Sequence, residues 1–225
     1  MTSRYALYET DQLRDRFALD VGLPRGVRPH YNVSPVQEVP VVVLRDGKRV
    51  VERMIWGFVP TGAKDTNSVF RYKTFASRSE GILDKPALRT ALRSQRCIIP
   101  VNGFYEWKTL ASGKRPFYIR LKTHELIGLA GVYSEWTDPA GVVHGVCTVI
   151  TIDSETESDM TPRRLPVIVD VADEADWLNP ELSDLSTLFR IMRPYDAEKL
   201  EIIPVSDAVN STKLDASDLI EKFQR

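Results

Sequence analysis

An acidic residue, Glu106, lies in the aromatic stretch VNGFYEW at positions 101–107, directly after the apolar run CIIP. If this stretch is a β-strand, Asn102, Phe104 and Glu106 share one face, because side chains alternate along a strand. Burial of a carboxylate among apolar neighbours costs free energy unless the group is paired or protonated. Two interpretations stay open on residue type alone. Glu106 is either half of a buried ion pair with an arginine or a carboxyl group with a raised pKa that acts as an acid or base.

Aromatic side chains are the second group that could do chemistry. Trp56, Tyr105, Trp107 and Trp136 lie near glycines or at predicted strand ends, with arginines close by in the sequence. Rings beside a basic groove can stack on unpaired bases, which contributes ~1–3 kcal/mol per base. Packing in the core is the commoner fate of any single aromatic residue. Both interpretations therefore stay open.

The net charge of the chain is −1, but its charged residues are unevenly distributed along the sequence. Residues 64–122 carry 13 basic and 4 acidic side chains, whereas residues 123–225 carry 8 basic and 20 acidic ones. Such segregation is typical of a solvated surface without a partner. It is also typical of a basic face for a polyanion such as nucleic acid.

Length and composition limit the class of protein. A chain of 225 residues with 43% hydrophobic and 27% charged residues is typical of a globular protein with a sizeable core. No apolar run is long enough to cross a membrane, and the N-terminus lacks the pattern of a signal peptide, so we expect a cytoplasmic protein. Cys97 and Cys147 lie in strand-like apolar runs and are expected to be buried free thiols. Three scattered histidines predict no metal site.

The elements that must position these residues are predicted to be mainly short strands. The pair Asp46-Gly47 between two β-branched runs predicts a hairpin over residues 39–60. Helices are expected at 11–19, capped by Thr10, and at 85–95, with an irregular loop at 61–75. Further strands are expected at 96–107, 115–121, 126–136 and 145–152. We therefore predict one α+β domain over residues 1–225, built mainly on antiparallel sheet curled toward a barrel.

A series of motifs along most of the chain resembles the SOS response-associated peptidase (SRAP) family, whose members process abasic sites in single-stranded DNA. GFYEW is the most specific motif, and the order and spacing of the others match the family. The motifs are RYA (4–6), YNVSP (31–35), MIWGFVP (54–60), RSE (78–80), RCIIPVNGFYEW (96–107), GLAGVYSEW (128–136), CTVIT (147–151), RLPVIV (164–169) and PVSDAVN (204–210). The resemblance implies the SRAP fold and a monomer that acts in the DNA damage (SOS) response.

The family's chemistry begins with a cysteine that follows the initiator methionine. Its α-amine forms a Schiff base with the ring-opened sugar aldehyde of the abasic site, and its thiol then closes a stable thiazolidine ring. The resemblance implies that the glutamate of GFYEW handles protons near the amine. It also implies that an asparagine before the RSE motif serves the reaction and that a histidine assists opening of the sugar ring.

The residues at these positions are only partly retained in this chain. Glu106 is present, but Thr2 stands at the cysteine position, Ala76 at the asparagine position and Pro162 at the histidine position. Gly62 stands where the family has a tryptophan that wedges into DNA. The resemblance implies a DNA-binding role for the residues that are retained elsewhere. These are Arg4, Asn32, Trp56, Arg78, Asn102, Trp107, Thr151 and Arg164.

These substitutions predict that the crosslinking step is impaired. Thr2 is small enough for removal of the initiator methionine, which leaves an α-amine for a transient imine. A hydroxyl, however, is a poorer ring-closing nucleophile than a thiolate. Pro162 has no titratable group, and Ala76 lacks the amide. His30, on the same predicted strand face as Asn32, is the one histidine for which a replacement role stays open.

Three functional hypotheses follow. The first is a weak enzyme that senses abasic sites through an imine. The second is a catalytically inactive, phage-related relative, or pseudoenzyme, that still binds single-stranded DNA. The third is a peptidase, a hydrolase acting on its own N-terminus, which the family name implies but which needs the missing cysteine. In each case we expect no cofactor, no metal and no membrane partner, with association to the nucleoid if the protein is bacterial.

Overall fold

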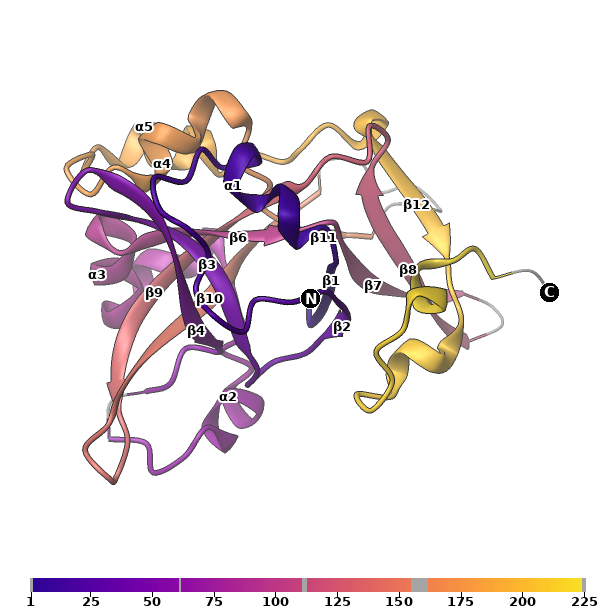
Figure 1. Cartoon of the computed structure of the whole chain (residues 1–225), viewed down its shortest axis with the longest axis horizontal. Coiled ribbons are helices and arrows are strands. Elements are labelled where there is room, and N and C mark those ends of the chain that lie inside the picture. Colours follow the sequence, from indigo (N-terminus) through magenta and orange to yellow (C-terminus); the bar gives the residue numbers. More distant parts are fainter. Residues whose placement is uncertain (1, 61, 111–112, 155–161, 224–225) are drawn as a thin grey trace.

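The computed structural model describes residues 2–60, 62–110, 113–154 and 162–223. Five strands form a closed barrel because β10 pairs with a strand on each side, in the order β10-β4-β3-β6-β9 and back to β10 (Figure 1). These strands are β3 (Glu38–Arg45), β4 (Lys48–Trp56), β6 (Arg96–Val101), β9 (Ile127–Thr137) and β10 (Val143–Asp153). The pairing of β10 with β4 is parallel, whereas the other pairs of the ring are antiparallel. The prediction of an α+β fold with a barrel-like sheet is confirmed.

A second sheet of five strands lies beside the barrel, in the order β12-β8-β7-β1-β2 (Figure 1). Its strands are β1 (Arg4–Leu7), β2 (His30–Val33), β7 (Gly103–Leu110), β8 (Gly113–Leu121) and β12 (Leu200–Pro204). Only Asn102 separates β6 from β7, so the GFYEW motif carries the chain directly from the barrel into this second sheet. Two short strands pair with the last residues of β10. They are β5 (Ala76–Arg78), which is parallel to β10, and β11 (Arg164–Pro166), which is antiparallel to it.

Short helices cover the outside. They are α1 (Leu13–Arg16), α2 (Asn67–Tyr72), α3 (Pro86–Ser94), α4 (Glu174–Leu178) and α5 (Leu185–Ile191), with 3₁₀-helices at Thr10–Gln12, Ser79–Asp84, Val171–Asp173, Ala197–Lys199, Asp207–Asn210 and Ser217–Ile220. In the described part of the chain, no helix has the length and apolar character needed to span a bilayer.

Two local predictions are confirmed, one is confirmed in part and one is wrong. Asp46 and Gly47 both have positive φ angles (50° and 74°), as a two-residue hairpin turn between β3 and β4 requires. The helix expected near residue 86 is α3, with Pro86 in its first turn. The helix expected at 11–19 is reduced to a 3₁₀ turn and the four residues of α1, and Thr10 makes no capping hydrogen bond. The loop expected at 61–75 contains α2.

The core fills the barrel and the space under the helices. β6 is buried along its whole length, because α3 and α4 pack against it from outside the barrel. Cys97 and Cys147 are both buried free thiols, as expected, and burial raises the pKa of Cys147 to about 12. At that pKa, the thiol stays protonated and unreactive at neutral pH.

Candidate functional site

Thr2 and Glu106 meet in the second sheet. β1 runs antiparallel to β7 with Arg4 opposite Tyr105, and this register brings the two residues before β1, Ser3 and Thr2, alongside Glu106. The Thr2 hydroxyl donates a hydrogen bond of 2.6 Å to Oε1 of Glu106. Thr2 is 0% exposed and Glu106 is 3% exposed. The acid in the aromatic stretch is therefore buried against the N-terminal residue at which the family's chemistry begins.

The environment of Glu106 shifts its proton affinity. Burial raises the pKa of Glu106 above its ordinary value of 4.5, and the Thr2 hydrogen bond and the charge of Lys114 act in the opposite direction. A carboxyl group shifted this way holds its proton more readily near neutral pH than an exposed glutamate does. This is the direction that the acid–base interpretation of Glu106 expects.

A pocket of about 320 Å³ opens beside this pair. Its lining combines one buried acid with two cationic side chains, a ring and an amide, and consists of Ser3, Arg4, Glu106, Trp107, Lys114 and Asn210. Such a lining suits a small polar ligand that carries negative charge. Sequence reasoning did not single out Lys114 or Asn210. Asn210 ends the motif PVSDAVN, and the β7–β8 hairpin, which pairs Thr109 with Lys114, brings Lys114 near β7.

Arg4 and Asn32 tie the C-terminal segment to the second sheet. Arg4 donates to Oδ1 of Asn32 (2.7 Å) and to the Val209 carbonyl (2.9 Å). The buried amide of Asn32 donates to the carbonyls of Ser211 (3.0 Å) and Leu214 (2.8 Å). Both predicted DNA-binding residues therefore hold residues 209–214 against the sheet, and Asn210 of that segment lines the pocket.

The aromatic residues divide into one at the pocket and three in the interior. Trp107 is half-buried, lines the pocket and donates from its indole nitrogen to Oδ1 of Asn210 (2.8 Å). Trp56 is 0% exposed, and its indole donates to the Phe75 carbonyl (2.9 Å). Tyr105 and Trp136 are also buried. Of the four rings, Trp107 is the one that a ligand in this pocket could touch.

Asn102 lies inside the fold and fixes the chain that leaves β1. Its Oδ1 accepts hydrogen bonds from the backbone nitrogens of Tyr8 (2.7 Å) and Glu9 (3.1 Å). Its amide nitrogen donates to Oε2 of Glu9 (2.5 Å). These contacts use the polar atoms of Asn102 to hold neighbouring backbone in place.

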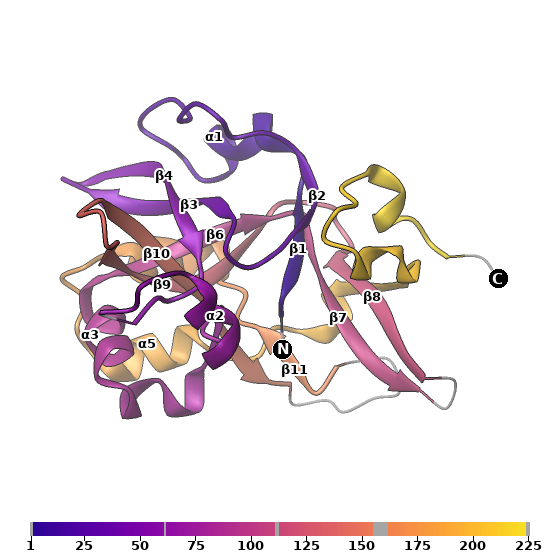
Figure 2. The same ribbon diagram turned by 90° about the horizontal axis from the view of Figure 1, so that it is seen from below.

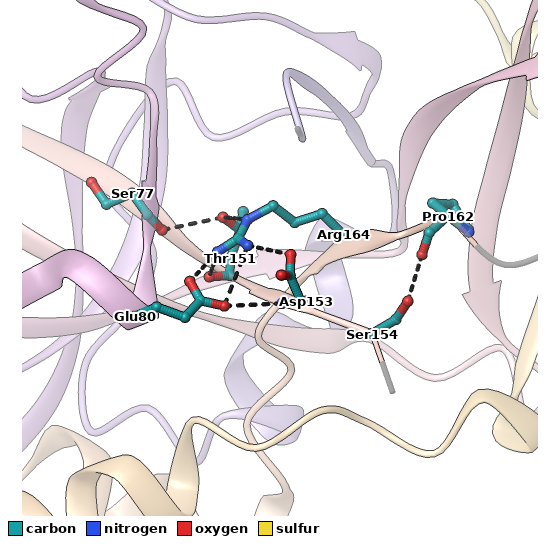
Figure 3. Close-up of polar contacts among 7 residues, drawn as sticks. All are labelled: Ser77, Glu80, Thr151, Asp153, Ser154, Pro162 and Arg164. Carbon is teal, nitrogen blue, oxygen red and sulfur yellow. Dashed lines mark hydrogen bonds and ion pairs between the residues drawn. The ribbon is translucent and has the colours of Figure 1, made fainter. Parts of the chain in front are cut away.

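A second polar cluster surrounds Arg164 at the end of β10 (Figure 3). The Arg164 guanidinium donates to Oγ1 of Thr151 (2.9 Å), to Glu80 (2.6 Å) and to Asp153 (2.5 Å). Thr151 in turn donates to the Ser77 carbonyl (3.2 Å). Two acidic groups therefore neutralise the arginine, although both of them are exposed.

Ala76 and Pro162 lie in the same region as this cluster. β5 pairs with β10 so that Ala76 lies opposite Val149, and Ala76 is buried. Pro162 precedes β11, and its carbonyl accepts a hydrogen bond of 2.8 Å from Ser154 (Figure 3). Neither side chain has a polar group for proton transfer. Figures 1 and 2 place the N-terminal end of β1 beside β11, so the second cluster neighbours the Thr2–Glu106 pair.

The remaining candidates lie at the surface. Arg78 pairs with Thr151 through the β5–β10 ladder, but its side chain is exposed and has no hydrogen-bond or ion-pair partner among the described residues. Gly62 is exposed and has a positive φ of 80°. His30 hydrogen-bonds through Nδ1 to Asp215 (2.6 Å) and not to the Thr2–Glu106 pair. The described side chains include no group of three or more His, Cys, Asp or Glu arranged to hold a metal ion.

Comparisons with known sequences point to one family, and a comparison with solved structures shows the same fold. The family model "SOS response associated peptidase (SRAP)" matches residues 1–212. The chain is 37% identical over 224 residues to the abasic site processing protein YoqW of Bacillus subtilis strain 168, covering 98% of this chain and 99% of that protein. It is 30% identical over 224 residues to the abasic site processing protein HMCES of Gallus gallus, covering 86% of this chain and 66% of that protein. A crystal structure of a Bacteroides thetaiotaomicron protein shares the fold, with a TM-score of 0.82 and 23% identity over 100% of this chain and 98% of that one.

Proposed function

The chain belongs to the SOS response associated peptidase family, and we propose that it recognises abasic sites in single-stranded DNA without forming a durable crosslink. The observation that carries the proposal is the buried hydrogen bond of 2.6 Å between Thr2 and Glu106 beside a pocket with two cations. Two relatives of this chain are named abasic site processing proteins. The pair keeps an N-terminal residue next to a carboxyl group, which are the two components that imine chemistry needs.

The reversible step would use the α-amine of Thr2 after removal of the initiator methionine; position 1 lies outside the described residues. The amine nitrogen attacks the sugar aldehyde carbon and forms a carbinolamine. The carbinolamine then loses its hydroxyl as water to give the imine. Glu106, with its raised pKa, supplies the proton that turns this hydroxyl into water and accepts a proton in the reverse direction. Arg4 and Lys114 favour a neighbouring phosphate through their positive charge.

The durable step is the one that we propose to be impaired. Closing a ring on the imine would need the Thr2 hydroxyl, a much weaker nucleophile at neutral pH than a thiolate. The hydroxyl donates a hydrogen bond to Glu106 and is held beside it, but the ring that it would form would reopen easily. The side chains of Ala76 and Pro162 also provide neither the amide nor the imidazole that the resemblance implies at these two positions.

A second candidate function is abasic-site-independent binding of single-stranded DNA with no imine at all. The observation that favours it is Arg78 at the end of β5, whose exposed side chain has no hydrogen-bond or ion-pair partner among the described residues and whose strand also carries the inert Ala76. Under this alternative, affinity would come from phosphate contacts and stacking and would fall with salt concentration.

A crosslinking assay on a single-stranded oligonucleotide with one abasic site tests the proposal. Mass spectrometry first verifies that the initiator methionine is absent, and denaturing gels then compare lanes with and without borohydride, which reduces an imine to a stable amine. We expect a band only with borohydride, and its loss in Glu106→Gln. The matched variant combines Thr2→Cys, Ala76→Asn and Pro162→His, and it should give a band without reductant.

Other outcomes have distinct meanings. A band from the unmodified chain without borohydride would show that Thr2 supports a durable adduct, which contradicts the impairment. No band in either lane, with binding of the same oligonucleotide in solution, would support the second candidate. Absence of binding altogether would overturn both.

A further inference from the structure

Residues 210–218, which we call the strap, run along the second sheet with all of their side chains exposed. Val209 before the strap and Leu219 near its far end are buried in the same apolar cluster. Apolar packing therefore anchors both ends of the strap but not its middle, so polar contacts must fix its course. Figure 2 shows this part of the chain in yellow, next to β2 and β8.

Asp215 makes the contacts that join the strap to β2. Its Oδ1 accepts hydrogen bonds from the backbone nitrogens of Tyr31 (2.5 Å) and Asn32 (3.1 Å). Its Oδ2 lies 2.6 Å from Nδ1 of His30. One carboxyl group therefore binds three consecutive residues of β2, which is the last strand in the order of its sheet.

The carboxyl group of Asp215 is ionised at neutral pH. Burial alone would raise its pKa, but the hydrogen bonds from His30 and from the Tyr31 nitrogen lower it below the ordinary value of 3.8. Nε2 of His30 accepts a hydrogen bond from Arg28 (3.3 Å), so the proton of the ring is on Nδ1 and is directed at Asp215. Hydrogen bonds to an ionised acceptor are about twice as strong as those between neutral groups.

The contacts of Asp215 extend to the pocket through Asn32. Asp215 binds the backbone nitrogen of Asn32, and the side-chain amide of Asn32 donates to two backbone carbonyls of the strap. Oδ1 of Asn32 accepts from Arg4, and Arg4 also donates to the carbonyl of Asn210 (3.2 Å). One series of hydrogen bonds therefore runs from Asp215 to Arg4 and Asn210, which both line the pocket.

The position of the strap also determines the surroundings of Trp107. The Trp107 indole lines the pocket and donates to the side chain of Asn210, the first residue of the strap. If the strap left β2, Asn210 would move away from the pocket. The indole of Trp107 would then lose its acceptor, and Arg4 would lose one of the carbonyls that hold its guanidinium. The pocket would keep its charged groups but not their arrangement.

We propose that Asp215 is a positioning residue for the Thr2–Glu106 pocket. By binding β2 it holds the strap, and through the strap and Asn32 it holds Asn210 and Arg4 where a ligand meets them. Asp215 does not line the pocket itself, and it lies beyond residue 212, where the family match ends. The inference rests on the proposed function, because the ligand of this pocket is the abasic strand.

Tryptophan fluorescence reports the position of the strap without DNA. Acrylamide should quench chiefly Trp107, which is half-buried, because the other three tryptophans of the chain are buried: Trp56, Trp136 and Trp177. In Asp215→Ala, the quenching constant should rise as Asn210 leaves Trp107. Asp215→Asn keeps an oxygen acceptor for the two backbone nitrogens of β2, so its quenching should lie between wild type and Asp215→Ala. This variant carries the test if circular dichroism shows that Asp215→Ala does not fold.

Affinity for DNA separates a positioning effect from a charge effect, because the two have opposite signs. Loss of an acid makes the protein more attractive to a polyanion, so charge alone would strengthen binding. Asp215→Ala should instead bind a single-stranded oligonucleotide with one abasic site about tenfold more weakly, the equivalent of one charge-assisted hydrogen bond from a misplaced Arg4. The matched control is Asp218→Asn, which removes the charge of an exposed acid three residues away and should not weaken binding or raise quenching.

Each other result overturns the proposal in a distinct way. Equal quenching of Asp215→Ala and wild type would show that Asp215 does not hold the strap. Increased quenching without a loss of affinity would show that the strap moves but that the ligand does not depend on it. If the wild type itself binds no oligonucleotide, the proposed function fails and the role of Asp215 fails with it. If the wild type binds and only the Asp215 variants disagree, the proposed function stands and the positioning role is wrong.

Discussion

Thr2 and Glu106 are separated by 104 positions in the sequence and meet through a buried hydrogen bond of 2.6 Å from hydroxyl to carboxylate. The contact joins the second residue before β1 to the fourth residue of β7, and the β1–β7 pairing holds both in place. Because Glu106 is only 3% exposed, water has little access to its carboxyl group, and the Thr2 hydroxyl supplies a hydrogen bond in place of water. A substitution at Thr2 should therefore affect both the free energy of unfolding and the candidate chemistry.

Removing the Thr2 hydroxyl should destabilise the fold. Thr2→Ala deprives the buried Glu106 carboxylate of one donor, and such a loss costs about 1–3 kcal/mol in the free energy of unfolding. Thr2→Ser keeps the hydroxyl and serves as the control, with an expected loss of less than half of that. Urea denaturation at pH 7 measures both. Equal stability of Thr2→Ala and wild type would show that the hydrogen bond contributes nothing net.

The raised pKa of Glu106 predicts the direction of a pH effect. A carboxyl group whose pKa is higher in the folded state binds a proton more tightly there, so its stabilising contribution is fully present below 4.5 and is lost as pH rises through the folded-state value. The free energy of unfolding of wild type relative to Glu106→Gln should therefore fall as pH increases above 4.5, by at most about 1.4 kcal/mol per pH unit. Denaturation of both proteins from pH 4 to 8 would reveal it. A difference that stays constant with pH would mean that Glu106 titrates normally.

Local patterns predicted the elements that form from short-range signals. The β3–β4 hairpin depends on a two-residue turn that needs positive φ at Asp46 and Gly47, and α3 depends on an apolar stripe after Pro86. Closure of the barrel depends on β10 pairing with two strands at once, one of them parallel, and no local pattern encodes such long-range pairing. The helix α2 was missed because it buries a single residue, Val69, and so leaves no apolar period in the sequence.

The site was predictable in part for the same reason. The resemblance and the alternation of β7 identified Glu106 as a buried acid with an assigned role. The partners of Arg4 and Asn32, however, lie at residues 209–214, far along the chain, and only the folded structure reveals that both side chains bind backbone there. The two acids that pair with Arg164 come from the 3₁₀-helix Ser79–Asp84 and from β10, and sequence spacing does not predict that they meet.

The glycine of GFYEW should resist substitution for a steric reason. A Cβ at Gly103 would lie 2.5 Å from the Ile119 carbonyl oxygen and 2.5 Å from the Tyr118 ring. Because one neighbour is backbone of the paired strand β8, Gly103→Ala should lower the free energy of unfolding by about 1–3 kcal/mol or more. Gly22→Ala is the control, since a Cβ there meets nothing within 4 Å. Thermal unfolding that is alike in the two variants would contradict the prediction.

Freeing Arg164 from its acids should strengthen binding of single-stranded DNA. The double variant Glu80→Gln, Asp153→Asn removes the two carboxylates that neutralise the guanidinium and leaves Thr151 to orient it (Figure 3). A phosphate can then accept the released donors, and one charge-assisted hydrogen bond of about 1.5 kcal/mol corresponds to a gain of about tenfold in affinity. The control Glu38→Gln, Glu201→Gln makes the same change in net charge at two other exposed acids that pair with arginines. Anisotropy at two salt concentrations separates the cases, because a new phosphate contact also steepens the salt dependence by about 0.7. If both double variants gain equally, the effect is one of net charge, and Arg164 holds β10 and β11 together without contacting DNA.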